Sequence, residues 1–193
     1  MNDARLERLF TETLRLISEQ GFYGTPMSQI AKCTGISIGS IYNQFENKEV
    51  LLNELYKKIK IDFANHVFEH LHAHDPIEKQ LKDMLTQIFY YYLEHRQALN
   101  FIEQYENSPL IRPQTQQDLQ PHVQRIVQTF KQGMQEHKIK ELPAESLIAL
   151  CFGAVSSLAK LYVRKAAQQI RPEEIDTLID AVLSMARADS AGR

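Results

Sequence analysis

Apolar residues recur three and four positions apart along most of this chain, whereas no stretch alternates apolar and polar residues as a half-buried strand would. The pattern predicts an all-α protein of nine helices. We expect them at about residues 3–20, 26–34, 38–44, 48–71, 76–95, 97–106, a stretch that ends near 137, 143–167 and 172–188. No repeat or low-complexity linker interrupts the series.

Local signals predict where most helices begin. A hydroxyl or amide side chain can accept hydrogen bonds from the first free N–H groups of a helix, so Thr25, Ser37 and Asn47 are the expected N-caps of the second, third and fourth helices. The start of the seventh helix stays open, because it begins at one of three prolines or is kinked by the last of them: Pro109, Pro113 and Pro121.

The composition is that of a globular protein, with 44% hydrophobic and 24% charged residues. No apolar run reaches the roughly 20 residues that span a bilayer, and the N-terminus lacks the order of a signal peptide. These features predict a cytoplasmic location. Cys33 and Cys151 both lie in helical apolar patterns, so small core residues are a better interpretation than a disulfide.

Charge alone does not point to a partner. Residues 1–60 carry eight Lys or Arg and seven Asp or Glu, while residues 61–193 carry fourteen and seventeen, for a net charge of −2. The N-terminal third is therefore not strongly basic. Any contact with nucleic acid must come from a few well-placed groups.

Residues 25–48 have the layout of a helix-turn-helix. Two short helices flank a turn at residues 34–36, where Gly35 permits a left-handed backbone. Four apolar residues can fix the angle between the two helices: Ile30, Ala31, Ile36 and Ile41. Phe45 can pack this pair against the first helix.

The exposed positions of this segment suggest a phosphate partner. The second helix begins with small uncharged residues, which let helix N-terminal N–H groups approach phosphates or bases. Gly39 costs helix stability of order 1 kcal/mol relative to Ala. Lys48 opposes the dipole of the helix that it begins, by roughly 0.3–1 kcal/mol, unless an anion lies there. The alternative is an ordinary helical hairpin with a solvated lysine.

This segment resembles the DNA-binding motif of the TetR family of repressors. The matching residues are Gly21-Phe22-Tyr23-Gly24-Thr25, Ile30-Ala31, Gly35-Ile36-Ser37, Gly39-Ser40-Ile41-Tyr42, Phe45, Lys48-Glu49 and Leu51-Leu52. The match covers about residues 6–56. Beyond it, only the number and length of the helices are similar to the family.

The resemblance implies a nine-helix repressor with a DNA-binding domain over 1–47 and a ligand-binding and dimerisation domain over 48–193. It also implies a homodimer that reads a palindromic operator. The implied DNA-binding residues are Thr25, Ser37, Ile38, Gly39, Ser40, Tyr42, Asn43, Gln44 and Lys48. Among them, phosphate contacts fall to Thr25, Ser37, Tyr42 and Lys48. Ile38 departs from the family, which often has a basic or polar residue there.

The last two helices carry apolar residues on more than one face. A helix that is apolar around most of its circumference must be buried by more than its own core. We expect a four-helix bundle across a two-fold axis, with an interface formed by Cys151, Ala154, Val155, Leu158, Tyr162, Ile175, Leu178, Ile179 and Val182. The alternative is that both helices only complete the core of one chain.

Aromatic residues concentrate in the middle helices. An aromatic stripe is more often core than pocket, but Tyr90, Tyr91 and Tyr92 are about 100° apart and cannot all face one core. The family resemblance implies an effector pocket among these helices. Its expected residues are Tyr91, Phe101, Glu103, Gln104, Tyr105 and Phe130. The histidines at 66, 70, 72 and 74 suit a solvated helix end better than a metal site.

Other classes of function have little support. No nucleotide-binding, metalloprotease or hydrolase motif occurs, so we expect no catalysis and no cofactor. The expected partners are double-stranded DNA, a second copy of the chain and a small, largely apolar effector that releases the DNA. The alternative is a DNA-binding protein with a protein partner in place of the effector, or with no effector.

Overall fold

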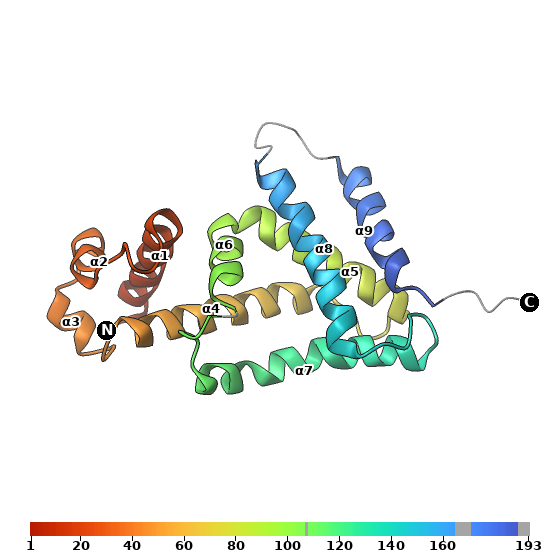
Figure 1. Cartoon of the computed structure of the whole chain (residues 1–193), viewed down its shortest axis with the longest axis horizontal. Coiled ribbons are helices and arrows are strands. Elements are labelled where there is room, and N and C mark those ends of the chain that lie inside the picture. The colour runs from red at the N-terminus through yellow and green to blue at the C-terminus, as the bar shows by residue number, and fades with distance from the viewer. Residues whose placement is uncertain (107, 165–170, 189–193) are drawn as a thin grey trace, which may run out of the picture. The chain divides into compact units, whose positions relative to one another are not determined.

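The computed structural model describes residues 1–106, 108–164 and 171–188 (Figure 1). Within these ranges the chain forms nine α-helices and no strand beyond one isolated bridge between Ile139 and Arg187. The helices are α1 (Asp3–Gln20), α2 (Met27–Thr34), α3 (Ile38–Tyr42), α4 (Lys48–Glu69), α5 (Ile77–Glu94), α6 (Arg96–Tyr105), α7 (Pro113–Gln135), α8 (Ala144–Arg164) and α9 (Pro172–Ala186). The predicted all-α fold is confirmed.

Capping and proline signals account for most boundaries. Ser37 caps α3 by accepting a hydrogen bond from Ser40 N at 3.2 Å, and Asn47 Oδ1 accepts one from Val50 N at 3.0 Å. α7 begins at Pro113 and contains Pro121. The predicted end of the eighth helix at Ala167 lies outside the described residues.

One predicted cap is wrong. The N-cap of α2 is Pro26, which makes no side-chain capping bond. The Thr25 hydroxyl instead donates backward to the Gly21 carbonyl at 2.9 Å, which closes the loop between α1 and α2. A threonine hydroxyl can bond either to the helix that follows or to the turn that precedes it. Here the Gly21 carbonyl at the end of α1 is close enough to accept the Thr25 hydroxyl, so the helix that follows is left without this cap.

The chain forms two compact units. The first comprises residues 1–60 and 97–119, and the second comprises 61–96 and 120–193. α4 and α7 therefore contribute residues to both. The division into domains after residue 47 stays a prediction.

The first unit buries one face of each short N-terminal helix. Phe10 of α1 lies 6.1 Å from Phe45, measured between ring centroids, which packs the end of the helix-turn-helix against α1 as predicted. Ile30 and Ile41 are fully buried. Cys33 corrects the prediction of a core residue, because it lies about a quarter turn from the buried face of α2 and is exposed.

In the second unit α5 packs against α8 and α9, which also contact each other (Figure 1). Of the three consecutive tyrosines, Tyr91 and Tyr92 are buried, whereas Tyr90 leaves the core and lines a shallow pocket of about 550 Å³. α8 is unusually apolar, with a mean hydropathy of 1.7 over a window of which only 22% is buried. By length and composition alone α8 could span a membrane. A helix that packs its exposed apolar face against another protein chain has the same length and composition.

Candidate nucleic-acid interface and apolar groove

The turn between α2 and α3 is held from both sides. Gly35 adopts a left-handed backbone, with φ of 64°. The Thr34 hydroxyl donates to the Ile30 carbonyl at 2.8 Å and accepts from Ile36 N at 3.3 Å. Since the hydroxyl uses both its donor and its acceptor capacity, the angle between α2 and α3 is fixed by hydrogen bonds as well as by apolar packing.

The outer face of α3 is exposed and mostly uncharged. We call residues 37–44 of this face the recognition surface. The hydroxyl groups of Ser37 and Ser40 lie 2.7 Å apart at its N-terminal end. Ile38 and Tyr42 keep 43% and 48% of their surface exposed, which is high for large apolar side chains. Since Ile41 of the same helix is buried, α3 turns one face to the core and leaves this face uncovered by the described residues.

Gly39 has no reason within the chain to be glycine. A Cβ atom built there meets no atom within 4 Å, and its backbone is not left-handed. Gly35, by contrast, needs its positive φ. The described residues thus give no packing or backbone reason for a glycine at position 39, and its role in an approach from outside stays a prediction.

The C-terminal part of the recognition surface is polar. Asn43 ends α3 and Gln44 follows it, both exposed. Gln44 Oε1 lies 3.5 Å from the N-terminal ammonium of Met1, a distance at which a hydrogen bond is weak. Both amides are thus available to read hydrogen-bonding groups.

Thr25 lies apart from these residues. Its exposed fraction is 0%, and its hydroxyl is bonded to Gly21. It thus positions α2 by closing the preceding loop. Of the four expected phosphate contacts, it is the one whose side chain the structure leaves inaccessible.

Lys48 joins the start of α4 to the loop after α1. Its ammonium donates to the Phe22 carbonyl and lies 3.9 Å from the centroid of the Phe22 ring. Burial lowers the pKa of this lysine. The carbonyl and the ring offset only part of the cost of burying a cation at the first position of a helix, and the two remaining ammonium protons can still meet a phosphate.

Three exposed cations of the first unit were not among the predicted contacts. Arg5, Arg8 and Lys32 form no ion pair within the described residues. The other cations of residues 1–60 besides Lys48 pair with acidic residues: Arg15, Lys57, Lys58 and Lys60. The net charge of the segment does not distinguish paired from unpaired cations, because the pairing depends on the fold. Tyr23, 90% exposed beside the same helices, was also missed.

The predicted effector residues fall into both units. Phe101, Glu103, Gln104 and Tyr105 belong to the first unit, and Tyr91 and Phe130 to the second. The four aromatic side chains are buried, while Glu103 and Gln104 are exposed.

Tyr91 lies in an aromatic cluster of the second unit. The ring centroids of Phe63, His66 and His95 lie 5.2, 5.4 and 4.4 Å from its own. Burial raises the pKa of Tyr91 and lowers that of His66, whose Nε2 is buried without a hydrogen-bond partner. No group of three potential metal ligands occurs among the described residues.

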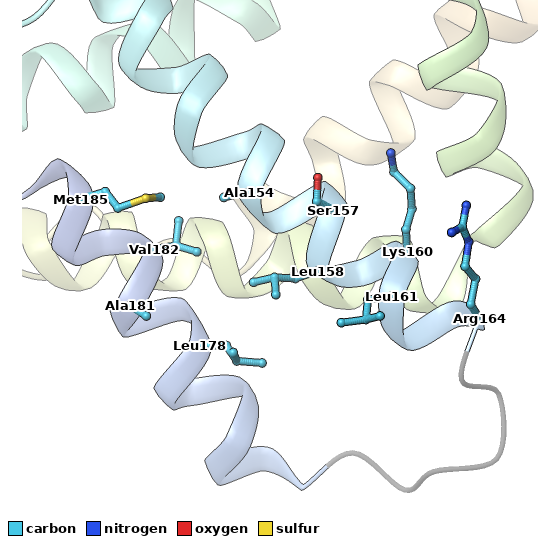
Figure 2. A pocket seen from close by; sticks show the side chains of 10 residues that line it. All are labelled: Ala154, Ser157, Leu158, Lys160, Leu161, Arg164, Leu178, Ala181, Val182 and Met185. Carbon is cyan, nitrogen blue, oxygen red and sulfur yellow. The ribbon is translucent and has the colours of Figure 1, made fainter.

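An open apolar groove of about 740 Å³ lies between α8 and α9 (Figure 2). We call it the α8–α9 groove. Its lining residues are Ala154, Ser157, Leu158, Lys160, Leu161, Arg164, Leu178, Ala181, Val182 and Met185. Leu158 and Leu161 of α8 point toward α9, and Leu178 of α9 points back toward them.

The predicted interface residues divide between this groove and the core. Ala154, Leu158, Leu178 and Val182 line the groove. Tyr162 is half-buried, with its hydroxyl donating to Glu174. The rest are buried within the chain: Cys151, Val155, Ile175 and Ile179. Leu161 and Met185, both exposed, were missed because helical periodicity does not say which apolar face the chain itself covers.

A helix pair with a fixed turn and an exposed second helix defines a helix-turn-helix protein. Residues 9–55 match the family model for bacterial regulatory proteins of the tetR family, and residues 76–183 match the model for a tetracyclin repressor-like C-terminal domain. The chain belongs to the TetR family of helix-turn-helix transcriptional regulators. Members of this family are generally not enzymes, and they bind DNA and small-molecule effectors.

Individual proteins support the assignment. An uncharacterized HTH-type transcriptional regulator of Haemophilus influenzae is 28% identical over 103 residues, which cover 53% of this chain and 55% of that protein. The chain thus spans about half the length of that relative. A TetR family regulator from Marinobacter aquaeolei superposes with a TM-score of 0.87, at 19% identity over 97% of both chains.

A third similarity involves a structure with a bound ligand. FadR from Bacillus subtilis, crystallised in complex with stearoyl-CoA, superposes with a TM-score of 0.70 at 20% identity, over 93% of this chain and 96% of that one. At such identities the superpositions establish the fold alone.

Proposed function

We propose that this protein is a cytoplasmic, non-enzymatic repressor that binds a palindromic operator as a homodimer and is released by a small, largely apolar effector. The observation that carries the proposal is the recognition surface, with its exposed Ile38 and Tyr42 and its unfilled space at Gly39. Among the described residues, the only hydrogen bond to a side chain of this surface from elsewhere is the long one between Met1 and Gln44. The small polar residues of the surface suit DNA better than a second protein core.

The recognition surface suggests a division of roles. Ser37 and Tyr42 offer hydroxyl groups to phosphates, while Asn43 and Gln44 offer amides to base edges. Gly39 lets the protein backbone approach the DNA closely. Ser40 and Ile38 would lie at the mouth of the DNA major groove, where Ile38 suits contact with a thymine methyl group. Lys48 adds a charged phosphate contact. The unpaired cations Arg5, Arg8 and Lys32 supply further attraction to the DNA backbone.

The α8–α9 groove supports the dimer. Leu158, Leu161 and Met185 expose apolar surface on two adjacent helices, and a second copy can cover both through a two-fold axis. The two recognition surfaces of such a dimer would meet half-sites one helical turn apart. Burial in this dimer interface would account for the apolar character of α8 without insertion into a membrane.

The aromatic cluster around Tyr91 supports an apolar effector in the second unit. Phe63 and Tyr92 supply apolar surface, while the unpartnered His66 Nε2 supplies a polar handle. Because FadR of Bacillus subtilis is found with stearoyl-CoA, a long-chain acyl thioester is the first effector to test. A protein partner in place of the effector is the second candidate.

One experiment tests the whole proposal. A palindromic duplex is first selected from a random library with the purified protein, and its affinity is measured with and without stearoyl-CoA. We expect selective binding by a dimer, and an effector that lowers operator affinity. Linkage then requires that the operator weaken effector binding by the same factor, which calorimetry measures. Equal effector affinity in both states would rule out release by that effector, and failure to select any duplex would rule out the repressor.

A further inference from the structure

Asn53 of α4 is buried, and its side chain is fully hydrogen-bonded. Its Nδ2 donates to the carbonyl oxygens of Glu49 and Leu110, each at 2.8 Å. Its Oδ1 accepts from Arg112 N at 2.9 Å and from the Thr115 hydroxyl at 2.8 Å. Both donors and both acceptor sites of the amide are therefore used, with only 3% of the residue exposed.

These bonds join two parts of the first unit that are far apart in sequence. Asn53 lies six residues after Asn47, directly downstream of the recognition surface. Three of its four partners lie in residues 110–115, which lead from α6 into the first turn of α7, and the fourth is the Glu49 carbonyl of α4 itself. An apolar contact tolerates sliding, but three directional hydrogen bonds between two segments are made in one register only. Asn53 thus fixes the 110–115 segment against the start of α4.

Contacts around Asn53 reinforce the same register. Exposed ion pairs link Lys57 to Asp118 at 3.3 Å and Lys60 to Glu106 at 2.6 Å. Such exposed pairs contribute little to stability, but they restrict the relative position of the segments that they join. Unlike these ion pairs, the Asn53–Thr115 hydrogen bond is buried.

A second contact ties α6 to the loop before α2. The Tyr105 ring lies 6.3 Å from that of Phe22, between centroids. The Phe22 carbonyl in turn accepts from Lys48 at the start of α4. The loop that leads into α2 is therefore held by α4 and α6 together.

We propose that Asn53 is a positioning residue for specific DNA recognition. By holding residues 110–115 against the first turns of α4, it keeps α4 and the loop before α2 in the one arrangement that presents the recognition surface correctly. The inference rests on the proposed function as a DNA-binding regulator. Recognition of base edges needs the helix placed within a fraction of an ångström, whereas attraction to phosphates does not. Loss of the Asn53 bonds should therefore reduce specific binding far more than non-specific binding.

The test compares four variants of the full-length protein. Asn53→Leu removes all four bonds, and Thr115→Val removes one with little change of shape. Thr115→Ser keeps the hydroxyl and serves as the conservative rescue. Thr13→Val is the matched control, because Thr13 is equally buried but its hydroxyl has no hydrogen-bond partner to lose. Each is measured against the palindromic duplex selected by the wild type and against a random-sequence duplex, by fluorescence anisotropy.

We expect Asn53→Leu to weaken binding to the selected duplex by about tenfold or more and to the random duplex by less than about twofold. Thr115→Val should give a smaller loss of the same kind, whereas Thr115→Ser and Thr13→Val should match the wild type. If Asn53→Leu fails to fold, Thr115→Val against Thr115→Ser decides the question. Equal losses on both duplexes, or no loss on the selected one, would overturn the inference. A wild type that selects no duplex would contradict the proposed function instead, and the inference would fall with it.

Discussion

The recognition surface and the α8–α9 groove both expose large apolar side chains, but in different surroundings. On α3, Ile38 and Tyr42 are separated by small polar residues on a convex helix. In the groove, Leu158 and Leu161 of α8 and Leu178 of α9 point toward one another across the space between two helices (Figure 2). Exposed apolar residues thus indicate a partner in both places. The chemistry around them indicates which partner: isolated side chains among hydroxyls and amides suit DNA, and a continuous apolar groove suits a second protein chain.

The two surfaces also differ in how the chain supports them. The recognition surface follows a hydrogen-bonded turn at Thr34, and the proposed positioning residue Asn53 acts through directional hydrogen bonds as well. The groove is backed by packed apolar residues such as Val155 and Ile179. Base recognition requires directional placement, whereas association of apolar faces depends mainly on the area buried.

The largest effect should come from a charge in the groove. Leu158→Glu would bury an unpaired carboxylate in the proposed dimer interface, so we expect monomers in sedimentation. Operator affinity should fall by about a hundredfold or more, because two half-sites are no longer bound together. Leu142→Glu is the matched control, since Leu142 is an exposed leucine that precedes α8 and lies outside the groove. An intact dimer in the Leu158 variant would place the interface elsewhere.

The next effect concerns base readout. Asn43→Ala should remove discrimination worth about 1–3 kcal/mol at one base pair of each half-site. Selection from a random duplex library by the variant should therefore relax one symmetric pair of positions and leave the others unchanged. Ser40→Ala should alter a neighbouring position. An unaltered selected sequence for both variants would mean that other residues read the bases.

A smaller and uniform effect should follow from Lys48→Ala. Loss of one phosphate contact should weaken binding to all duplexes by about tenfold and reduce the slope of log affinity against log salt by about 1. The same variant loses the contacts to Phe22, so its melting temperature should also fall. Lys32→Ala provides a control, as a cation whose removal should change the slope without lowering the melting temperature. If the salt slope of the Lys48→Ala variant equals that of the wild type, Lys48 contributes to the fold and makes no phosphate contact.

The smallest effect has opposite signs for stability and for binding. Gly39→Ala should stabilise the fold by roughly 0.5–1 kcal/mol, because alanine favours a helix and its Cβ meets no atom of the chain. The added methyl group should nevertheless weaken operator binding several-fold by blocking close approach of the DNA. Chemical denaturation and anisotropy measure the two quantities. A variant that is more stable and binds equally well would remove Gly39 from the interface.

The sequence predicted local features well. Ser37 and Asn47 cap the expected helices, and Gly35 adopts the expected left-handed turn, whereas the start of α7 stayed open among three prolines until the structure placed it at Pro113. These features depend on hydrogen bonds and backbone sterics within four residues, which the sequence displays directly. The helix-turn-helix could be identified for the same reason, because its whole motif fits within 24 consecutive residues.

What only the tertiary structure decided is which surfaces the chain covers by itself. Periodicity showed that α8 and α9 are apolar on more than one face, but packing against α5 buries Cys151 and Ile175 and leaves Leu161 and Met185 exposed. Three hydrogen bonds of Asn53 join it to residues that lie between 57 and 62 positions further along the chain, so no local sequence pattern predicts them. Lys48 is stabilised by a carbonyl 26 residues earlier. A sequence specifies short-range hydrogen bonding residue by residue, but burial and pairing depend on distant segments whose meeting is a property of the whole fold.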